Sequence, residues 1–280
     1  GPFEVDLYQY TPPLLILPRA ATVAGLGFLT TRQVWFASQS IVLLAAMVVL
    51  ARWIGGASGL LVLLLVPVVW LSPTTRITLQ IGNFQLTAFA LSILAMIAFD
   101  RGRARRGGFA LGFSAVSKIY PGVLGITLLV ERRWGAVAWT AAWSLVFTTA
   151  AWLALGSTPF VDFVRYQLPR IESGEAFFWI ENADGAAINY GIHGLVTKLR
   201  FLGLPWTGQD AANRAASLYA VILVALAFAS AWRLQALAGG AMDGERLRLR
   251  RAQAWLGLLS LASFLTPFLP ESYELVVTSH

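Results

Sequence analysis

Lys118 is the residue with the clearest chemical potential, because it stands in the middle of an otherwise charge-free run from 107 to 130. If this run enters a membrane, its charge costs about 3 kcal/mol or more, and such residues mark functional sites by default. An ammonium group suits a phosphate as a compact point charge. Snorkelling to an interface is the structural alternative. Tyr120 and Pro121 follow closely and would fix how the lysine approaches a ligand.

Three amides form a second candidate group, since Gln80, Asn83 and Gln85 fall within six residues, with Gly82 between them. The pattern predicts a helix mouth. The alternative is that Asn83 has no role beyond capping the helix. A helix cap, however, does not require Gln80 or Gln85. Amides are neutral hydrogen-bond partners for the hydroxyls of a sugar, so these three residues are candidates for sugar binding.

Carboxylates and phenols gather near the start of the chain. Glu4 and Asp6 are the only acidic residues before position 100, and Tyr8 and Tyr10 follow them. Either carboxylate could act as a general base, with Asp6 the nearer to the tyrosines. Aromatic residues at a membrane interface also serve as plain anchors, which is the alternative for Tyr8 and Tyr10.

The remaining candidates lie later in the chain, in a 59-residue stretch from 156 to 214 and beyond it. That length is unusual for a structureless connection. It holds Asn189, His193, Lys198 and Arg200. His193 is the only internal histidine and could be structural or catalytic. Glu271 follows two prolines that end the last apolar run, which predicts a carboxylate at the mouth of that span.

Composition excludes several classes of site. The chain has no cysteine and only two histidines, so thiolate metal sites, disulfides and a multi-histidine metal centre are all excluded. Apolar residues make up 57% and charged residues 12%, about half the charged share of soluble domains. These values predict a membrane protein whose chemistry uses carboxylates, amides, phenols, lysine and arginine, with no metal.

Charge-free runs predict an all-α polytopic protein, because about 20 apolar residues are needed to cross the bilayer as a helix. The predicted spans are 33–51, 54–75, 77–99, 134–161, 215–232 and 252–270. Pro73 and the polar residues 74–76 predict a turn between the second and third spans. The run 12–28, broken by proline and glycine, predicts an interfacial or re-entrant helix.

The distribution of charge predicts the orientation of these spans. Arg52 and the segments 100–106, 131–133 and 233–251 together hold 12 basic and 4 acidic residues, a net of +8, which leaves −1 for the rest of the chain. Basic loops stay on the cytoplasmic side. The basic excess is therefore an orientation signal and predicts no nucleic-acid partner. Polar stretches at 4–13, 72–83, 156–214 and beyond 270 then fall together on the outer side.

The run 107–130 is flanked by basic residues at both ends, although a single span has only one inner end. Proline interrupts helices and glycine tolerates turns, so 117–122 predicts a break. Two half-length helices would then enter from inside, meet at Lys118 and return. One tilted helix is the alternative. Gly108 and Gly112 have the spacing of small residues at helix contacts.

The order of these motifs resembles glycosyltransferase family 87. The matching motifs are Tyr-Thr-Pro-Pro-Leu-Leu at 10–15, Gln-Ile-Gly-Asn at 80–83, the basic turn, the segment 108–121 with Lys118, Glu-Arg-Arg-Trp at 131–134, the segment 189–199 and Leu-Thr-Pro-Phe at 265–268. The likeness covers nearly the whole chain. Each motif alone is weak, and their order makes the resemblance specific.

The resemblance implies a GT-C-like bundle of transmembrane helices that moves a hexose, such as mannose, from a polyprenyl-phosphate donor to a lipid or glycan acceptor. It implies transfer with inversion on the outer face of a bacterial plasma membrane, with membrane lipids as surroundings and no metal cofactor. Lys118, Tyr120, Lys198 and Arg200 would bind the donor phosphate. The sugar hydroxyls would contact Tyr10, Gln80, Asn83, Gln85, Asn189 and Glu271.

The family's catalytic aspartate follows a first span that these 280 residues lack. The resemblance therefore implies a base upstream of residue 1, with Asp6 and His193 as the candidates within the chain. We accordingly expect 1–280 to be one transmembrane domain, truncated at both ends and inactive alone. A transporter or flippase is an alternative function, since a broken helix with a buried lysine suits both. A non-catalytic membrane subunit is another.

Overall fold

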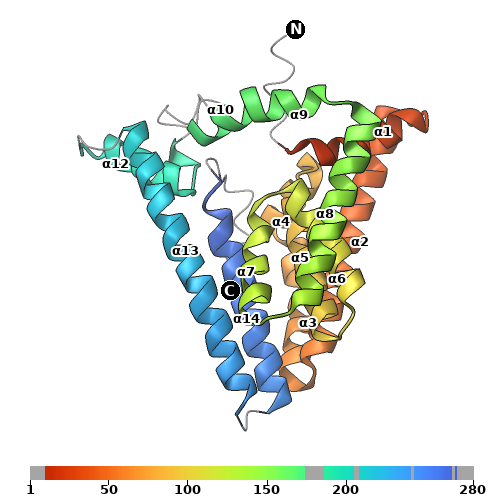
Figure 1. Cartoon of the computed structure of the whole chain (residues 1–280), viewed down its shortest axis with the longest axis vertical. Helices are drawn as coiled ribbons and strands as arrows, with labels where there is room; N and C mark the ends of the chain where they lie inside the picture. Colours follow the sequence, from red (N-terminus) through yellow and green to blue (C-terminus); the bar gives the residue numbers. More distant parts are fainter. Residues whose placement is uncertain (1–9, 174–185, 205–207, 241–242, 267–268, 270–280) are drawn as a thin grey trace.

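The computed structural model describes residues 10–173, 186–204, 208–240, 243–266 and 269. Within these residues the chain is helical and contains no β-strand. The prediction of an all-α polytopic membrane protein is confirmed. Figure 1 shows long helices running along the vertical axis and a layer of short helices across one end.

Among the described residues, three helices are long and apolar enough to cross a membrane: α2 (Phe28–Ile54, 27 residues), α8 (Trp134–Leu155, 22 residues) and α13 (Gln209–Ala238, 30 residues). A fourth candidate span is the pair α3 (Gly56–Leu71) and α4 (Pro73–Ile81), bent by 59° at the break between them. Many apolar side chains of these helices point outward, where lipid would cover them; Leu153 of α8, for example, is 81% exposed.

The turn predicted at 73–76 is wrong. Ser72 only bends the chain, because its hydroxyl accepts a hydrogen bond from the Thr75 N–H at 3.2 Å and Pro73 begins the next helix, a position that proline favours. Helix α4 ends instead at Gly82, whose φ is 77°. The helix that follows, α5 (Gln85–Asp100), has 16 residues.

The predicted hairpin of half-helices is present. Helix α6 (Ala104–Ser117) and helix α7 (Val123–Val130) are separated by the break that contains Lys118. After α7 the chain returns to the level at which α6 began, because Arg133 lies 3.7 Å from Asp100 at the end of α5. The single tilted helix is therefore excluded. Figure 1 shows α7 turning back below the level of α9 and α10.

Small residues let the hairpin pack closely between its neighbours. A Cβ atom at Gly108 would lie 2.6 Å from the backbone of Trp139 on α8, and one at Gly112 would lie 3.0 Å from the carbonyl oxygen of Thr140. The prediction that Gly108 and Gly112 form a helix contact is confirmed. This contact fixes the height at which the hairpin places Lys118.

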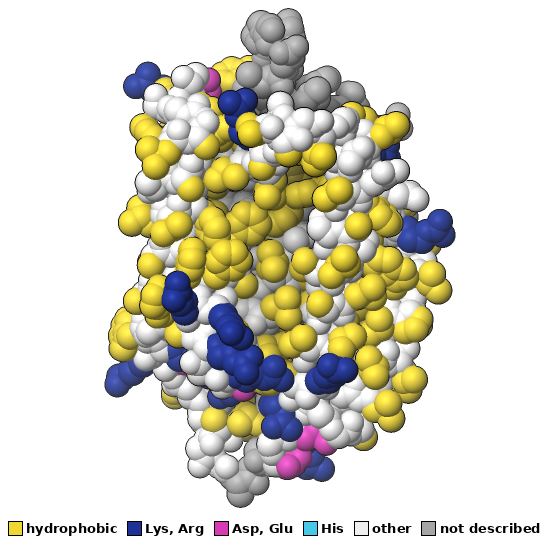
Figure 2. Space-filling model, turned by 90° about the vertical axis from the view of Figure 1, so that its right-hand side faces the viewer, with side chains coloured by type: hydrophobic (Ala, Val, Ile, Leu, Met, Phe, Trp, Pro, Cys, Tyr) yellow, Lys and Arg dark blue, Asp and Glu magenta, His cyan; other side chains and the backbone are white. Residues whose placement is uncertain are grey.

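The bundle has two chemically different ends. We call the end that carries Arg52 and the segments 100–106, 131–133, 233–240 and 243–251 the basic end (Figure 1). Figure 2 shows lysine and arginine side chains gathered in its lower part. There α14 (Gly244–Ser263) begins, and Trp255 of α14 stacks on Trp53 of α2 with ring centroids 5.1 Å apart.

We call the opposite end the loop end. It carries α1 (Ile16–Val23), α9 (Thr158–Asp162), α10 (Leu168–Ser173) and α12 (Ile192–Phe201), which lie across the bundle in Figure 1. The eight-residue α1 is too short to cross a membrane, as predicted for 12–28. The stretch 156–214 is predicted as one long loop, but its described residues are largely helical.

Candidate active site

Five candidate residues come together where the hairpin turns back, and we call them the tip cluster: Tyr10, Asn83, Gln85, Lys118 and Tyr120. They come from the chain before the first short helices, the α4–α5 turn, the start of α5 and the break between α6 and α7. Because these segments are far apart in sequence, only the fold brings the residues into contact.

Lys118 is held at the centre of the tip cluster by contacts to two other segments. Its Nζ donates a hydrogen bond to Gln85 Oε1 at 2.7 Å. The same nitrogen lies 5.0 Å from the centre of the Tyr10 ring, a distance at which a cation is attracted to the ring face. These contacts place the ammonium group between the start of α5 and the chain around Tyr10.

Asn83 and Tyr120 position the backbone of Gln85. Its backbone N–H donates to Asn83 Oδ1 at 2.9 Å, and its carbonyl oxygen accepts from the Tyr120 hydroxyl at 3.1 Å. The Gln85 side chain is only 1% exposed, and its Nε2 makes no hydrogen bond with the described residues. A buried amide donor without a partner is costly, so this nitrogen is a site where a ligand oxygen could bind.

Tyr10 links the start of the chain to the tip cluster. Its hydroxyl accepts a hydrogen bond from the Phe84 N–H at 3.3 Å. Burial raises the pKa of Tyr10, against hydrogen bonds from Phe84 and Asn83 that lower it. The phenol therefore stays neutral. Next to it, Thr11 Oγ1 donates to the carbonyl oxygen of Val116 and ties this segment to the last turn of α6.

An apolar layer supports the tip cluster from below. Leu14, Phe84 and Ala88 are buried together, and the ring of Phe113 on α6 meets that of Phe84 edge-on at 5.7 Å. The edge-on arrangement is a favoured aromatic geometry. The polar groups of the cluster therefore rest on packed rings and not on a mobile loop.

Three further predicted residues, Asn189, His193 and Lys198, lie in or next to α12. Asn189 is fully buried, and its Oδ1 accepts hydrogen bonds from the N–H groups of Gly191 and Leu269, both at 3.0 Å. This carbonyl oxygen therefore joins the start of α12 to the chain after α14. Lys198 lies with its Nζ 4.4 Å from the centre of the Tyr190 ring.

His193 lies in the first turn of α12 and is 5% exposed. Its Nε2 is 3.1 Å from Asn213 Oδ1, and its Nδ1 has no hydrogen-bond partner among the described residues. Burial lowers the pKa of His193, and the hydrogen bond to Asn213 offsets part of that effect. The imidazole is therefore neutral near pH 7.

Two predicted residues point away from both groups. Arg200 is exposed at the end of α12. Gln80 is also exposed; its carbonyl oxygen accepts a hydrogen bond from Arg32 at 3.2 Å. Gln80 and Arg32 line a cavity of about 700 Å³ between the start of α2 and the end of α4. The structure thus separates Gln80 from Gln85, its neighbour in the sequence motif.

Asp6 and Glu271, the two carboxylates among the predicted site residues, lie outside the described residues. Among the described residues of the loop end, Asp162 and Asp210 carry exposed carboxylates. No group of three His, Asp or Glu side chains that could hold a metal ion is found among the described residues.

A polar layer behind the tip cluster escaped prediction. Gln39 of α2 is 2% exposed and forms a side-chain hydrogen bond with Thr87 of α5 at 3.1 Å. Trp35 Nε1 donates to the carbonyl oxygen of Gly82 at 2.9 Å. The sequence feature that could have predicted this layer is Gln39, which stands between two serines within an apolar run. A glutamine in a membrane is costly unless it is hydrogen-bonded.

The comparisons with known proteins bear on this arrangement. The model of glycosyltransferase family 87 matches residues 8–267. No curated protein and no solved structure matches the chain. The matched segment begins before Tyr10 and includes all four other residues of the tip cluster. This chain therefore belongs to glycosyltransferase family 87.

Proposed function

We propose that the protein transfers a hexose, with mannose the first to test, from a polyprenyl-phosphate donor to a lipid or glycan acceptor, and that the tip cluster binds the donor phosphate. The family supports glycosyl transfer in general. The observation that carries the donor assignment is Lys118, held between Gln85 and Tyr10 where a helix break places it inside the bundle.

The position of Lys118 favours an anionic ligand. The ammonium group is a point charge suited to phosphate. It contacts Gln85, the first residue of α5, where the helix dipole adds partial positive charge. A polyprenyl-phosphate sugar keeps its tail in the bilayer and its phosphate at the interface, so a lysine on a membrane hairpin can meet it there.

The chemistry we propose is a single displacement with inversion. The acceptor hydroxyl oxygen bonds to the anomeric carbon, and the bond from that carbon to the phosphate oxygen breaks. The electron pair leaves on the polyprenyl phosphate, where Lys118 stabilises the anion. Tyr120 positions Gln85, and Lys198 and Arg200 attract the anionic donor to the loop end. No step uses a protein-bound metal.

The proton of the acceptor hydroxyl passes to a carboxylate acting as general base. Asp6 is the candidate for this base. Asn83 and Gln85 would orient sugar hydroxyls at the tip cluster, with Gln80, Asn189, His193 and Glu271 as further candidates. An Asp6→Asn variant that keeps full activity would remove Asp6 as the base.

We further propose that the basic end faces the cytoplasm of a bacterial cell and the loop end faces outward. Support comes from the arginine-rich turns gathered at one end (Figure 2), because basic loops stay on the cytoplasmic side. The tip cluster would then work on lipid-linked sugars presented at the outer leaflet.

The test is a transfer assay with the full-length protein in liposomes, a labelled polyprenyl-phosphate hexose and a membrane glycolipid extract as acceptor. We expect Lys118→Gln to lower the transfer rate by about 100-fold, the loss that follows removal of one stabilising donor. Arg165→Gln is the matched control, since it removes the same charge from an exposed site at the loop end. It should stay within about twofold of the wild type.

The same assay separates the alternatives. An enzyme moves label to the acceptor, a flippase only moves the labelled donor between leaflets, and a non-catalytic subunit does neither. Unchanged transfer by Lys118→Gln would overturn the phosphate role. Product with the anomeric configuration of the donor would overturn the single displacement.

A further inference from the structure

Arginines at the basic end serve two different purposes. Some hold the fold: Arg251 pairs with Asp100, and Arg248 Nε donates to the last backbone carbonyl of α2 at 2.9 Å. Two others, Arg233 of α13 and Arg250 of α14, line a cavity between these helices. The second pair has no role in the proposed transfer reaction.

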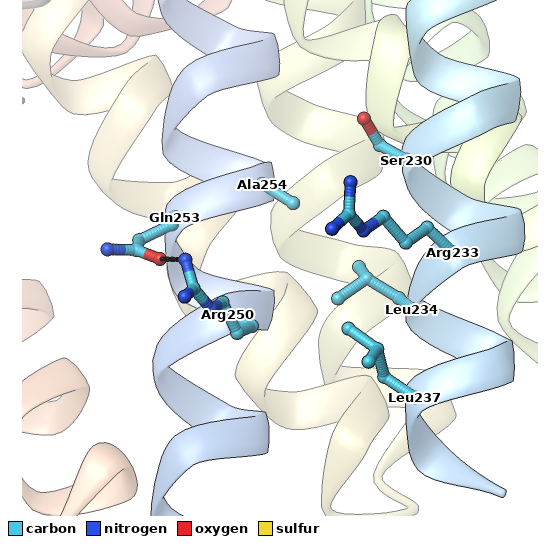
Figure 3. Close-up of a pocket in the computed structure, with 7 residues that line it drawn as sticks. All are labelled: Ser230, Arg233, Leu234, Leu237, Arg250, Gln253 and Ala254. Atoms are coloured by element: carbon cyan, nitrogen blue, oxygen red, sulfur yellow. Dashed lines mark hydrogen bonds between the residues drawn. The ribbon is translucent and has the colours of Figure 1, made fainter. Parts of the chain in front are cut away.

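The cavity has a volume of about 490 Å³ and lies between the facing sides of α13 and α14. Its polar lining residues are Ser230, Arg233, Arg250 and Gln253. Leu234 and Leu237 add an apolar wall. Figure 3 shows Arg233 reaching from α13 toward α14, while Arg250 and Gln253 lie together on α14. Two guanidinium groups from separate helices therefore border one hollow.

No lining residue neutralises these two charges. Arg250 donates to the neutral Gln253 Oε1 at 3.2 Å, and Arg233 forms no hydrogen bond or ion pair with any described residue. No carboxylate of the described residues lines the cavity. Glu245 accepts a hydrogen bond from a backbone N–H of α3 at 3.0 Å, and Asp100 binds other arginines. The cavity is a positively charged hollow that suits an anion.

The length of α13 and its exposed tryptophan place the cavity beyond the hydrocarbon core, at the level of lipid headgroups, if α13 spans the membrane. Helix α13 has 30 residues, or about 45 Å at 1.5 Å per residue, which exceeds the hydrocarbon core of about 30 Å. Arg233 is close to its basic end, and the adjacent Trp232 is 74% exposed. Exposed tryptophan is typical of the membrane interface.

We infer that the α13–α14 cavity binds the phosphate of an anionic phospholipid at the basic end of the bundle. Guanidinium groups bind phosphate with paired hydrogen bonds, and Arg233 and Arg250 can grip it from two sides. Ser230 and Gln253 offer hydrogen bonds to glycerol or ester oxygens, and Leu234 contacts the start of an acyl chain. The site is separate from the tip cluster and does not depend on the proposed function.

Native mass spectrometry and thermal melting of the full-length protein in detergent test this site. The probes are phosphatidylglycerol, the zwitterionic phosphatidylcholine and inorganic phosphate. We expect phosphatidylglycerol to bind and to raise the melting temperature, and the other two to have little effect. The double variant Arg233→Gln/Arg250→Gln should weaken phosphatidylglycerol binding by about 10-fold, as the loss of charge-assisted hydrogen bonds predicts.

The matched control is Arg101→Gln/Arg246→Gln, which removes two exposed charges from the same end without touching the cavity. It should weaken binding by less than about twofold. Equal loss in both double variants would overturn a specific site, and equal stabilisation by inorganic phosphate would overturn a lipid ligand. A photoactivatable phosphatidylglycerol should label α13 or α14 in the wild-type protein; labelling elsewhere would also overturn the site.

Discussion

The two ends of the α6–α7 hairpin differ in the groups that contact their charged side chains. At its root, Asp100 accepts a hydrogen bond from Trp53 Nε1 at 3.0 Å, pairs with Arg251 and lies 3.7 Å from Arg133. At its tip, Lys118 contacts an amide oxygen of Gln85 and the Tyr10 ring. The root joins charges of both signs, whereas these two contacts of the tip lysine are to neutral groups.

This difference indicates separate roles for the two ends. A compensated ion pair with an added hydrogen bond ties α2, α5, α14 and the start of α8 together, so the root is an anchor. In the proposed function, the tip places a cation where a substrate anion can bind. Substitutions at the root should therefore change stability, whereas substitutions at the tip should change the transfer rate.

The largest effect on stability is expected at the root. Asp100→Ala leaves Arg251 without its partner and removes the acceptor for Trp53, so we expect a loss of about 2 kcal/mol in the free energy of unfolding, measured by thermal melting in detergent. Asp100→Asn keeps an acceptor for Trp53 and should lose less. The control Asp162→Ala alters an exposed carboxylate at the loop end and should change little. An Asp100→Ala protein as stable as the wild type would refute the anchor.

At the tip, Gln85→Leu should lower the transfer rate by about 10-fold, equal to about 1.4 kcal/mol. The substitution removes the acceptor that positions Lys118 but keeps a side chain of similar size. Gln33→Leu is the matched control, because that glutamine is exposed near the start of α2 and lies outside the tip cluster. If both substitutions reduce transfer equally, the loss does not come from the contact between Gln85 and Lys118.

Lys118→Gln should leave stability within about 0.5 kcal/mol of the wild type, although it abolishes most transfer. Loss of the hydrogen bond to Gln85 is offset because a charge no longer has to be held at membrane depth. Melting of the two proteins under the same conditions measures the difference. A loss as large as that of Asp100→Ala would show that the tip lysine is a structural anchor too.

The smallest effect is a pH dependence at the loop end. Burial lowers the pKa of His193, so the folded state binds fewer protons than the unfolded state, whose histidine titrates near about 6.5. Stability is therefore fully present above the unfolded pKa, falls as the pH drops below it and levels off below the folded pKa. Melting curves from pH 7.5 to pH 5 should show a weaker fall in His193→Gln.

The matched control for that measurement is His280→Gln, which changes the only other histidine. It should keep the pH dependence of the wild type. Equal curves for His193→Gln and the wild type would mean that burial of this imidazole does not couple to folding.

Much of the fold could be predicted because it depends on local chemistry. Basic residues on both flanks of 107–130, with proline and glycine in its middle, predicted the hairpin. The prediction of a turn at 73–76 was wrong, because proline is favoured at the first position of a helix. Pro73 therefore begins a new helix. Whether a helix begins at such a proline depends on the cap that Ser72 provides and on packing against other helices. A short sequence motif does not contain this information.

Individual residues of the candidate site could be predicted from their types, but the contacts between them could not. Lys118 and Gln85 could be selected because a charge and an amide in apolar runs are costly unless they have partners. The separation of Gln80 from Gln85 could not be predicted, since Gly82 breaks the helical phase between them. Gln39 lies on a different helix and contributes only through a tertiary contact.

The membrane class, the helical architecture, the separation of basic and polar ends and the family follow from linear properties: hydrophobic length, charge placement and motif order. Which polar groups meet depends on the folded arrangement of the helices. It brought Tyr10 and Lys118 together, left Gln80 outside and opened a charged hollow between α13 and α14. The physical reason is that hydrogen bonds and cavities depend on helix packing and rotation, which residues distant in sequence determine jointly.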